Sequence, residues 1–232
     1  MINQLSIILL AYNEELSIEN DLKKIHQHIA KKIFNYEIIV VEDYSQDKTY
    51  EILQKYKKKI NIKILRGKSK LGYRDSLVYG IKNAKYKNIF FSEFGSKYNF
   101  EEFSNFANGY TEKCIFSGFR KPRYDNIYRR ILTYLLNGFI SILFFKKIND
   151  ADSGYKLISK DKYIKYYVKK CNFVDFGSAE MILRMYINKE KIIEKKISYY
   201  QRPDQSKQFN FYKVIKKSFI LVLKLISLRI ET

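Results

Sequence analysis

Two apolar runs near the start of the chain, residues 5–11 and 37–41, each lead directly into acidic and polar side chains. The residues that follow them are Tyr12, Asn13 and Glu14 in the first case and Glu42, Asp43 and Ser45 in the second. Carboxylates accept hydrogen bonds from a base edge and from ribose hydroxyls. Because neighbouring parallel strands open into one crevice at their carboxyl ends, the pattern predicts a nucleotide-sized site in the first quarter of the chain. The alternative is that these carboxylates cap the helices that follow.

The elements that must position this site alternate between strand and helix. Apolar runs predict strands at residues 5–11, 36–41, 61–65 and 88–91, and helical spacing predicts helices between them, the second with Ser45 as its N-cap. Such alternation predicts an α/β fold with a Rossmann-like, mostly parallel sheet flanked by helices. The second half predicts strands near 114–118 and 191–199, a helix over 127–145, a turn at 150–154 and a basic helical C-terminal extension.

The net charge of +20 is concentrated in the second half, where residues 120–232 carry 25 Lys/Arg and 10 Asp/Glu. Either the composition is biased throughout, or this half faces an anionic partner such as phosphate or lipid. The uncharged run at 133–145 and the apolar run at 219–230 are shorter than the ~20 residues that span a bilayer. For the first run a core position and a membrane-interface position both remain open, whereas the last helix favours the interface.

The two cysteines, Cys114 and Cys171, form neither a disulfide framework nor a zinc site by themselves, which favours a reduced, cytosolic environment. The N-terminus opens with a core strand and lacks the features of a signal peptide. No nucleic-acid motif accompanies the basic charge, so we expect no nucleic-acid partner.

Seven segments of the chain are similar to known sequence motifs. The first three are AYNE at 11–14, similar to PAYNE; VVEDYSQDKT at 40–49, similar to VVDDGSxDGT; and LGYRDSLVYG at 71–80, similar to NxGxGxAxxxG. The others are Arg129, Thr133 and Asn137 on one helix face; DADSGYK at 150–156, similar to DxxSGFR; Glu180 with Met181 at a late helix; and Arg202, Ser206 and Lys207, similar to RxxGxSK. In this order they resemble the motifs of the family 2 glycosyltransferases, particularly the dolichyl-phosphate and polyprenyl-phosphate sugar transferases.

The resemblance implies a GT-A domain over 1–205, with a nucleotide-binding half at 1–119, an acceptor half at 120–205 and an amphipathic helix at 206–232. It assigns the nucleotide sugar to Tyr12, Glu14, Glu42, Asp43 and Ser45, and the positive charge of Arg74 makes it a further candidate for the same ligand. It assigns the acceptor or its phosphate to Arg120, Arg129, Lys156, Arg202 and Lys207. For Glu42 a solvent-facing position is the alternative.

The implied catalytic carboxylates are Glu93, Asp150 and Glu180. A phosphate acceptor is already ionised, whereas a sugar hydroxyl needs a general base, for which Asp150 and Glu180 are the candidates. The alternative for residues 150–154 is a simple tight turn.

The family's Asp-x-Asp position, whose two carboxylates hold Mg²⁺ or Mn²⁺, reads Ser92-Glu93-Phe94. Glu93 is the only metal ligand left, so the sequence predicts a weakened metal site. Lys70 and Arg74 are candidates to supply the missing positive charge. Tyr44, Lys48 and Arg74 stand where the family has glycines, which predicts a reshaped nucleotide pocket.

The expected reaction is therefore inverting transfer of a sugar from a nucleotide diphosphate sugar to a polyprenyl phosphate. The alternatives are transfer to a glycan hydroxyl and a degenerate, non-catalytic scaffold that binds nucleotide or a partner. The expected location is cytoplasmic, peripheral on an anionic membrane surface.

Overall fold

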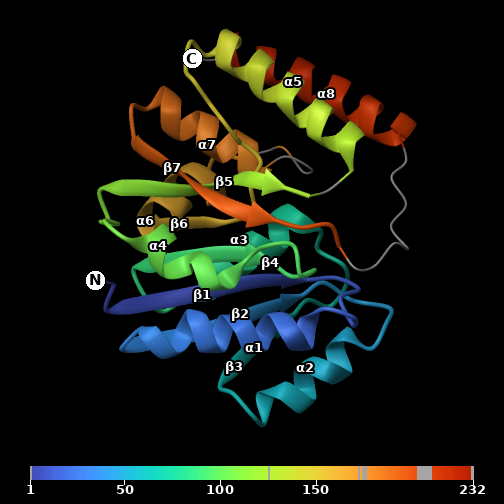
Figure 1. The fold of residues 1–232 in the computed structure, drawn as a ribbon, viewed down its shortest axis with the longest axis vertical. Coiled ribbons are helices and arrows are strands. Elements are labelled where there is room, and N and C mark those ends of the chain that lie inside the picture. The colour runs from blue at the N-terminus through green and yellow to red at the C-terminus, as the bar shows by residue number, and fades with distance from the viewer. Residues whose placement is uncertain (1, 125, 172, 174–176, 203–210, 231–232) are drawn as a thin grey trace.

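The computed structural model describes residues 2–124, 126–171, 173, 177–202 and 211–230, and for 211–219 only the helical backbone. Its centre is a seven-stranded sheet in the order β3-β2-β1-β4-β6-β5-β7 (Figure 1). The strands are β1 Gln4–Ala11, β2 Asn35–Glu42, β3 Ile62–Arg66, β4 Asn88–Glu93, β5 Cys114–Arg123, β6 Lys156–Ser159 and β7 Lys191–Tyr199. The predicted α/β fold with a mostly parallel sheet is confirmed, because only β6 runs antiparallel to its neighbours.

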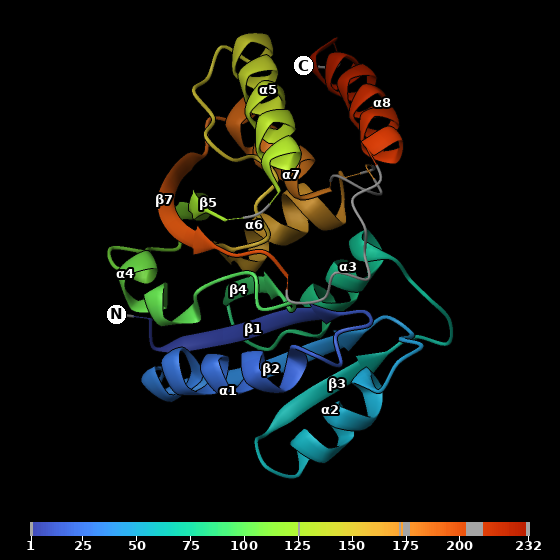
Figure 2. The ribbon, with the colours of Figure 1, turned by 45° about the vertical axis from the view of Figure 1, so that its right-hand side comes forward.

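Helices cover both faces of the sheet (Figures 1 and 2). One face packs against α1 Ile18–His28, α2 Thr49–Lys57, η2 Phe100–Glu102 and α4 Phe103–Ala107. The other packs against α3 Tyr73–Asn83, α6 Lys160–Tyr163, η3 Ile164–Val168 and α7 Gly177–Ile187. A short η1, Ala30–Lys32, precedes β2. The predicted Ser45 N-cap is wrong: α2 begins four residues later, where the Thr49 N–H donates to Asp47 Oδ1.

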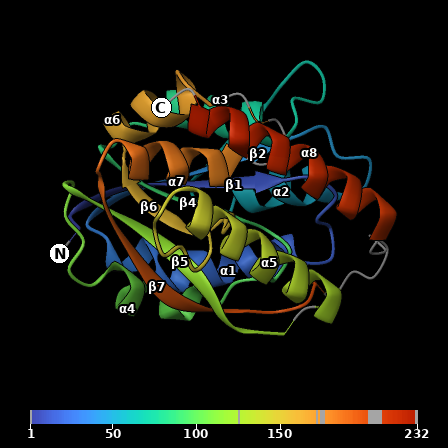
Figure 3. The same ribbon diagram turned by 90° about the horizontal axis from the view of Figure 1, so that it is seen from above.

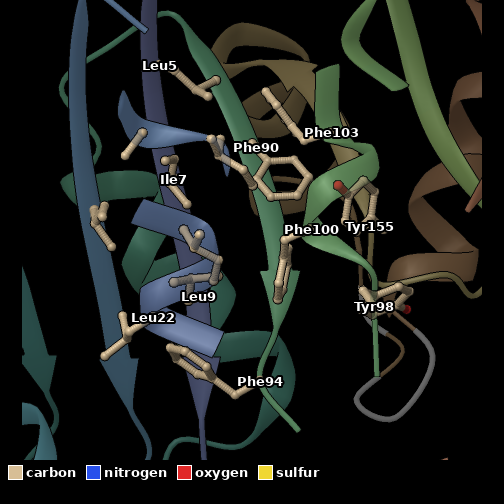
Figure 4. Packing of buried hydrophobic residues seen from close by; sticks show 14 of the residues in the cluster. Leu5, Ile7, Leu9, Leu22, Phe90, Phe94, Tyr98, Phe100, Phe103 and Tyr155 are labelled. Atoms are coloured by element: carbon tan, nitrogen blue, oxygen red, sulfur yellow. The ribbon is translucent and has the colours of Figure 1, made fainter. Parts of the chain in front are cut away.

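Phe94, directly after β4, belongs to the core cluster on the α1 face, together with Leu9 and Leu22 (Figure 4). The side chain has no exposed surface. Tyr98 and Tyr155 extend the same cluster toward β6, with ring centroids 5.3 Å apart. The segment that leaves β4 is thus fixed by its own aromatic side chains.

A third cluster joins α5 Ile127–Leu143 and α8 Phe211–Ile230 to α7 (Figure 3), at the end of the molecule opposite α2 (Figure 1). Ile140 of α5 and Leu221, Leu225 and Leu228 of α8 are buried there. Other apolar side chains of these helices are exposed: Ile127, Ile131, Tyr134, Leu135, Ile142, Ile220, Leu223, Ile226 and Ile230. Across the part of the chain that the structure describes, no helix combines the length and apolar character needed to cross a bilayer.

Candidate active site

The carboxyl ends of β2, β1 and β4 lie side by side, since Leu10 pairs with Val41 on one side and with Glu93 on the other. Two loops that follow these strands are joined by hydrogen bonds. The Asn13 N–H donates to Ser45 Oγ at 3.0 Å, and the Glu14 N–H donates to Thr49 Oγ1 at 2.7 Å. The structure therefore brings together the predicted nucleotide-binding residues 12–14 and 42–45.

Both acidic residues after β2 organise backbone. Glu42 has no exposed surface; its Oε1 accepts from the Ser45 N–H at 2.5 Å, and its Oε2 lies 2.7 Å from Arg66 Nε. The solvent-facing alternative for Glu42 is wrong. Asp43 accepts from the Leu71 and Gly72 N–H groups at 2.6 and 3.0 Å. Asp43 thus fixes the turn before α3, where Gly72 has a φ of +81°.

The two loops carry backbone that is uncommon for side-chain-bearing residues. Asn13 and Tyr44 have φ values of +53° and +63°. The Tyr44 position therefore keeps the left-handed conformation that glycine adopts most easily, and its ring packs on Arg66 at 4.6 Å. Lys70 Nζ lies 3.4 Å from the ring centroid of Tyr12, so this predicted cation packs against the first of these loops.

Arg202 brings the C-terminal part of the chain to this edge. Its Nη2 donates to Glu14 Oε2 at 2.6 Å, and its guanidinium lies against Gly95 after β4. Arg202 and Glu14 are 188 positions apart in the sequence, yet they form one ion pair across the site. Lys207 and Ser206 lie outside the described residues.

Glu93 does not have the surroundings of a metal ligand. Its Oε2 lies 2.5 Å from Lys97 Nζ, and Tyr73 donates to its carboxylate. Its Oε1 lies so close to Gly154 that a side chain at that position would collide with it. Burial alone would raise the pKa of Glu93, but the charges of Lys97 and Arg120 outweigh it and hold the pKa below its ordinary value. Within the described residues, no three His, Cys, Asp or Glu side chains gather as a metal-binding group. The predicted role of Glu93 as a metal ligand does not fit this placement.

Arg120 and Asp150 form an internal ion pair instead of facing a substrate. Arg120 Nε and Nη2 donate to the two carboxylate oxygens of Asp150 at 2.6 and 2.7 Å, and both side chains are under a tenth exposed. The Asp150 backbone N–H donates in turn to Glu194. Asn137 of α5 accepts from the Ala151 N–H. The turn at 150–154 is therefore a fixed junction between β5, β7 and α5, and a catalytic role for Asp150 does not fit it.

Three further predicted site residues are bonded to other groups of the protein. Lys156 is fully enclosed and donates to the Ser153 carbonyl, so its assignment to an acceptor phosphate does not fit. Glu180 is also enclosed, between Arg184 and the Phe173 N–H, which does not fit a general base. Arg74 donates to the Cys171 carbonyl and to Asp75. Arg129 is exposed on the first turn of α5.

The sequence analysis missed two residues of this site. Lys97 lies in no recognised motif, and because residues 94–97 are not helical, its spacing of four from Glu93 does not by itself indicate the pair. Asp21 of α1 accepts from the Gly95 and Ser96 N–H groups at 2.9 and 2.8 Å and so anchors the loop after β4. A helix residue that holds a loop 74 positions away leaves no local sequence signal.

Asp152 gives the site a pH-dependent group. Burial raises its pKa to about 6 from an ordinary 3.8, with Arg120 and Lys156 opposing and Asp150 and Glu93 adding to the rise. The folded state therefore holds this proton more tightly than the unfolded state, so its contribution to stability is present below about pH 4 and is lost as the pH rises through about 6. We expect Asp152→Asn to flatten this fall in urea-unfolding measurements at pH 4 to 7. An unchanged pH profile in the variant would contradict the assignment.

Comparison with known proteins matches the chain to glycosyltransferases. The model of Glycosyl transferase family 2 matches residues 6–166. The dolichyl-phosphate beta-glucosyltransferase of Dictyostelium discoideum is 26% identical over 177 residues, which cover 68% of this chain and 54% of the relative. The dolichol-phosphate mannosyltransferase of Pyrococcus furiosus is 33% identical over 81 residues, 35% of this chain and 22% of the relative. The chain thus spans about half the length of the first relative, and its match covers less than a quarter of the second.

Among solved structures, glucosyl-3-phosphoglycerate synthase from Mycobacterium tuberculosis, in complex with Mn²⁺, UDP and phosphoglyceric acid, has the same fold. The TM-score is 0.69 at 15% identity, and the match covers 98% of this chain and 78% of that one. At this identity the likeness concerns the fold alone. The predicted GT-A architecture is confirmed by it.

Proposed function

Because the chain belongs to glycosyl transferase family 2, we propose that it transfers a sugar from a nucleotide diphosphate sugar to a polyprenyl phosphate, with inversion at the anomeric carbon. The dolichyl-phosphate and dolichol-phosphate relatives support this choice of acceptor. Residues 1–119 supply the donor half and residues 120–205 the acceptor half, from which Arg202, expected to bind the acceptor, reaches the donor half instead. The helix beyond them supplies a membrane contact.

The observation that carries the proposal is the meeting of acidic strand ends with an arginine from the far end of the chain. Glu14 and Asp43 follow adjacent parallel strands at the crevice where α/β sheets bind nucleotides. The guanidinium of Arg202, held 2.6 Å from Glu14, provides a planar donor set suited to phosphate oxygens. Base recognition at one end and phosphate recognition at the other is the requirement of a sugar-nucleotide donor.

The ion pairs of Asp150 and Glu180 favour a phosphate acceptor over a sugar hydroxyl. Asp150 and Glu180 are both committed to buried arginine pairs and are poorly placed to take a proton from a sugar hydroxyl. A phosphate oxygen is already ionised, and it attacks the anomeric carbon while the nucleoside diphosphate leaves from the opposite face. The acceptor phosphate requires positive charge, which the exposed Arg129 provides on α5.

One observation favours transfer to a glycan hydroxyl instead. Asp152 is partly exposed, and burial raises its pKa to about 6, close to the range of a general base. The activity of an Asp152→Asn variant distinguishes a hydroxyl acceptor from a phosphate acceptor. With a hydroxyl acceptor the turnover number should fall on the order of 10² to 10⁴-fold, whereas glycosylation of a phosphate should proceed nearly unchanged.

Calorimetric titration tests the donor half directly. UDP, GDP and their glucose, N-acetylglucosamine and mannose conjugates are titrated into the full chain, and one family of conjugates is expected to bind. Absence of binding by all of them would favour the non-catalytic scaffold, whose ligand would then be a partner protein.

We also propose that α5 and α8 rest on an anionic membrane, which makes the protein peripheral on a cytoplasmic face. Their exposed apolar side chains lie next to cations, including Arg129, Lys146 and Arg229. Leu135 and Ile142 are 60% and 75% exposed and lie seven positions apart on one helix. We expect Leu135→Glu with Ile142→Glu to reduce co-sedimentation with phosphatidylserine vesicles at least about tenfold, since burial of apolar area is replaced by charge.

The matched control for this variant is Phe34→Glu. Phe34 is 89% exposed and lies directly before the amino end of β2, so the substitution places a charge outside α5 and α8. It should bind vesicles like the unmodified protein. Equal binding by the α5 double variant would remove this face as the membrane contact.

A further inference from the structure

The family resemblance implies a divalent metal ion beyond β4, but the residues present do not fit one. Phe94 is packed in the core and Ser92 is enclosed, so neither can reach an ion (Figure 4). Glu93, the remaining carboxylate, is already paired with an ammonium group. We infer that Lys97 replaces the metal: its ammonium neutralises the diphosphate of the donor, and donor binding needs no divalent ion. This rests on the proposed function, because it requires a nucleotide diphosphate at this edge.

The position of Lys97 is fixed from three sides. Its Nζ lies 2.5 Å from Glu93 Oε2, and its side chain is 11% exposed. Its carbonyl accepts from the Tyr200 N–H at 2.8 Å. The two preceding N–H groups, of Gly95 and Ser96, donate to Asp21. The ammonium is therefore held at the carboxyl end of β4, the place where the family's acidic pair would hold its ion.

Three cations gather there, each beside one carboxylate: Lys97 with Glu93, Arg202 with Glu14 and Arg120 with Asp150. Lys97 and Arg120 both act on the carboxylate of Glu93, and Arg202 is close enough to act on Lys97. Burial would lower the pKa of Lys97, yet Glu93 more than offsets it, so the side chain stays charged. Two cations, Lys97 and Arg202, thus converge near Gly95, and the carboxylates of Glu93 and Glu14 are engaged with them rather than with a metal ion.

An ammonium suits this task chemically. It carries three N–H donors in a compact point charge, and the described bond to Glu93 uses one of them. The others can bond oxygens of the departing diphosphate, which leaves as an anion and gains most from a fixed positive charge. The cations predicted from sequence are less suited, since Lys70 lies over Tyr12 and Arg74 is bonded to Cys171 and Asp75.

Titration of UDP, GDP and UMP into the full chain, in EDTA and then with excess Mn²⁺ or Mg²⁺, tests this inference. We expect the preferred nucleoside diphosphate to bind with similar affinity in all three conditions. Lys97→Met should weaken its binding at least about tenfold in EDTA, without rescue by metal. If the uridine nucleotide is preferred, UMP binding should change less, because UMP lacks the second phosphate.

Two further variants distinguish the loss of the ammonium group from misfolding. Glu93→Gln combined with Lys97→Met leaves no unpaired buried charge and should still bind the diphosphate weakly, whereas Lys97→Arg should retain most of the affinity. Lys113→Met removes the same charge from an exposed loop before β5 and should bind like the unmodified protein. Far-UV circular dichroism verifies that each variant is folded.

The outcomes separate this inference from the function on which it rests. Binding by the unmodified protein only when Mn²⁺ or Mg²⁺ is present would overturn the role of Lys97 while supporting a sugar-nucleotide site. Unchanged affinity in the double variant would also overturn it. Absence of binding in every condition would overturn the proposed function and this inference together.

Discussion

Replacing Phe94 by aspartate is expected to unfold the protein rather than to restore a metal site. The side chain is fully buried among Leu9, Leu22 and other residues of the α1 face (Figure 4). Removal of a buried phenylalanine costs about 3 to 5 kcal/mol, and a carboxylate left in the same place adds a desolvation penalty. The free energy of unfolding of a whole domain is roughly 5 to 15 kcal/mol, so this single change removes a large part of it.

Urea unfolding followed by circular dichroism measures this effect. Phe34→Asp is the control, because Phe34 is 89% exposed and the same substitution there should leave the midpoint nearly unchanged. A folded Phe94→Asp variant that binds Mn²⁺ would contradict both the packing and the conclusion that this chain has no acidic pair to restore.

Loss of Asp150 is expected to destabilise the protein by about 3 to 5 kcal/mol, because it leaves the Arg120 guanidinium buried without its partner. The Arg120 side chain is 8% exposed, so water replaces the lost carboxylate poorly. Burial would raise the pKa of Asp150, but Arg120 holds it below its ordinary value, which indicates that the carboxylate is ionised in the fold. Asp150→Ala should therefore lower the urea midpoint strongly.

The corresponding control is Glu19→Ala, which breaks an ion pair with Lys23 in which both side chains are at least half exposed. Such surface pairs contribute little, so its midpoint should barely move. An Asp150→Ala variant that is as stable as the unmodified protein but inactive in sugar transfer would return Asp150 to the catalytic role that the sequence suggested.

The sequence was sufficient for the first half of the fold because each strand there has its own apolar run and each helix its own helical spacing of apolar residues. The adjacency of Glu14 and Asp43 follows from that pattern, since parallel strands open at one edge. β6 was not predicted: it has four residues, Lys156–Ser159, of which only Leu157 and Ile158 are apolar, and a run this short does not indicate a strand.

The roles of charged side chains were harder to predict than their positions. Motif matching assigned Asp150, Lys156 and Glu180 to substrate, whereas the structure pairs each with a group inside the protein. Conversely, Lys97 belongs to no motif and became visible only when the loop after β4 was seen to return to Glu93. Pairings of this kind depend on tertiary geometry, which a linear spacing does not contain.

The most direct test of the account is sugar transfer itself. The full chain is incubated with UDP-glucose, UDP-N-acetylglucosamine or GDP-mannose and with a polyprenyl phosphate in phosphatidylserine vesicles, and the products are analysed by mass spectrometry. The account predicts that one donor yields a polyprenyl phosphate carrying a single sugar, together with the free nucleoside diphosphate. Donor binding without any glycosylated lipid, also when glycan acceptors are supplied, would contradict a transferase and leave a nucleotide-binding scaffold.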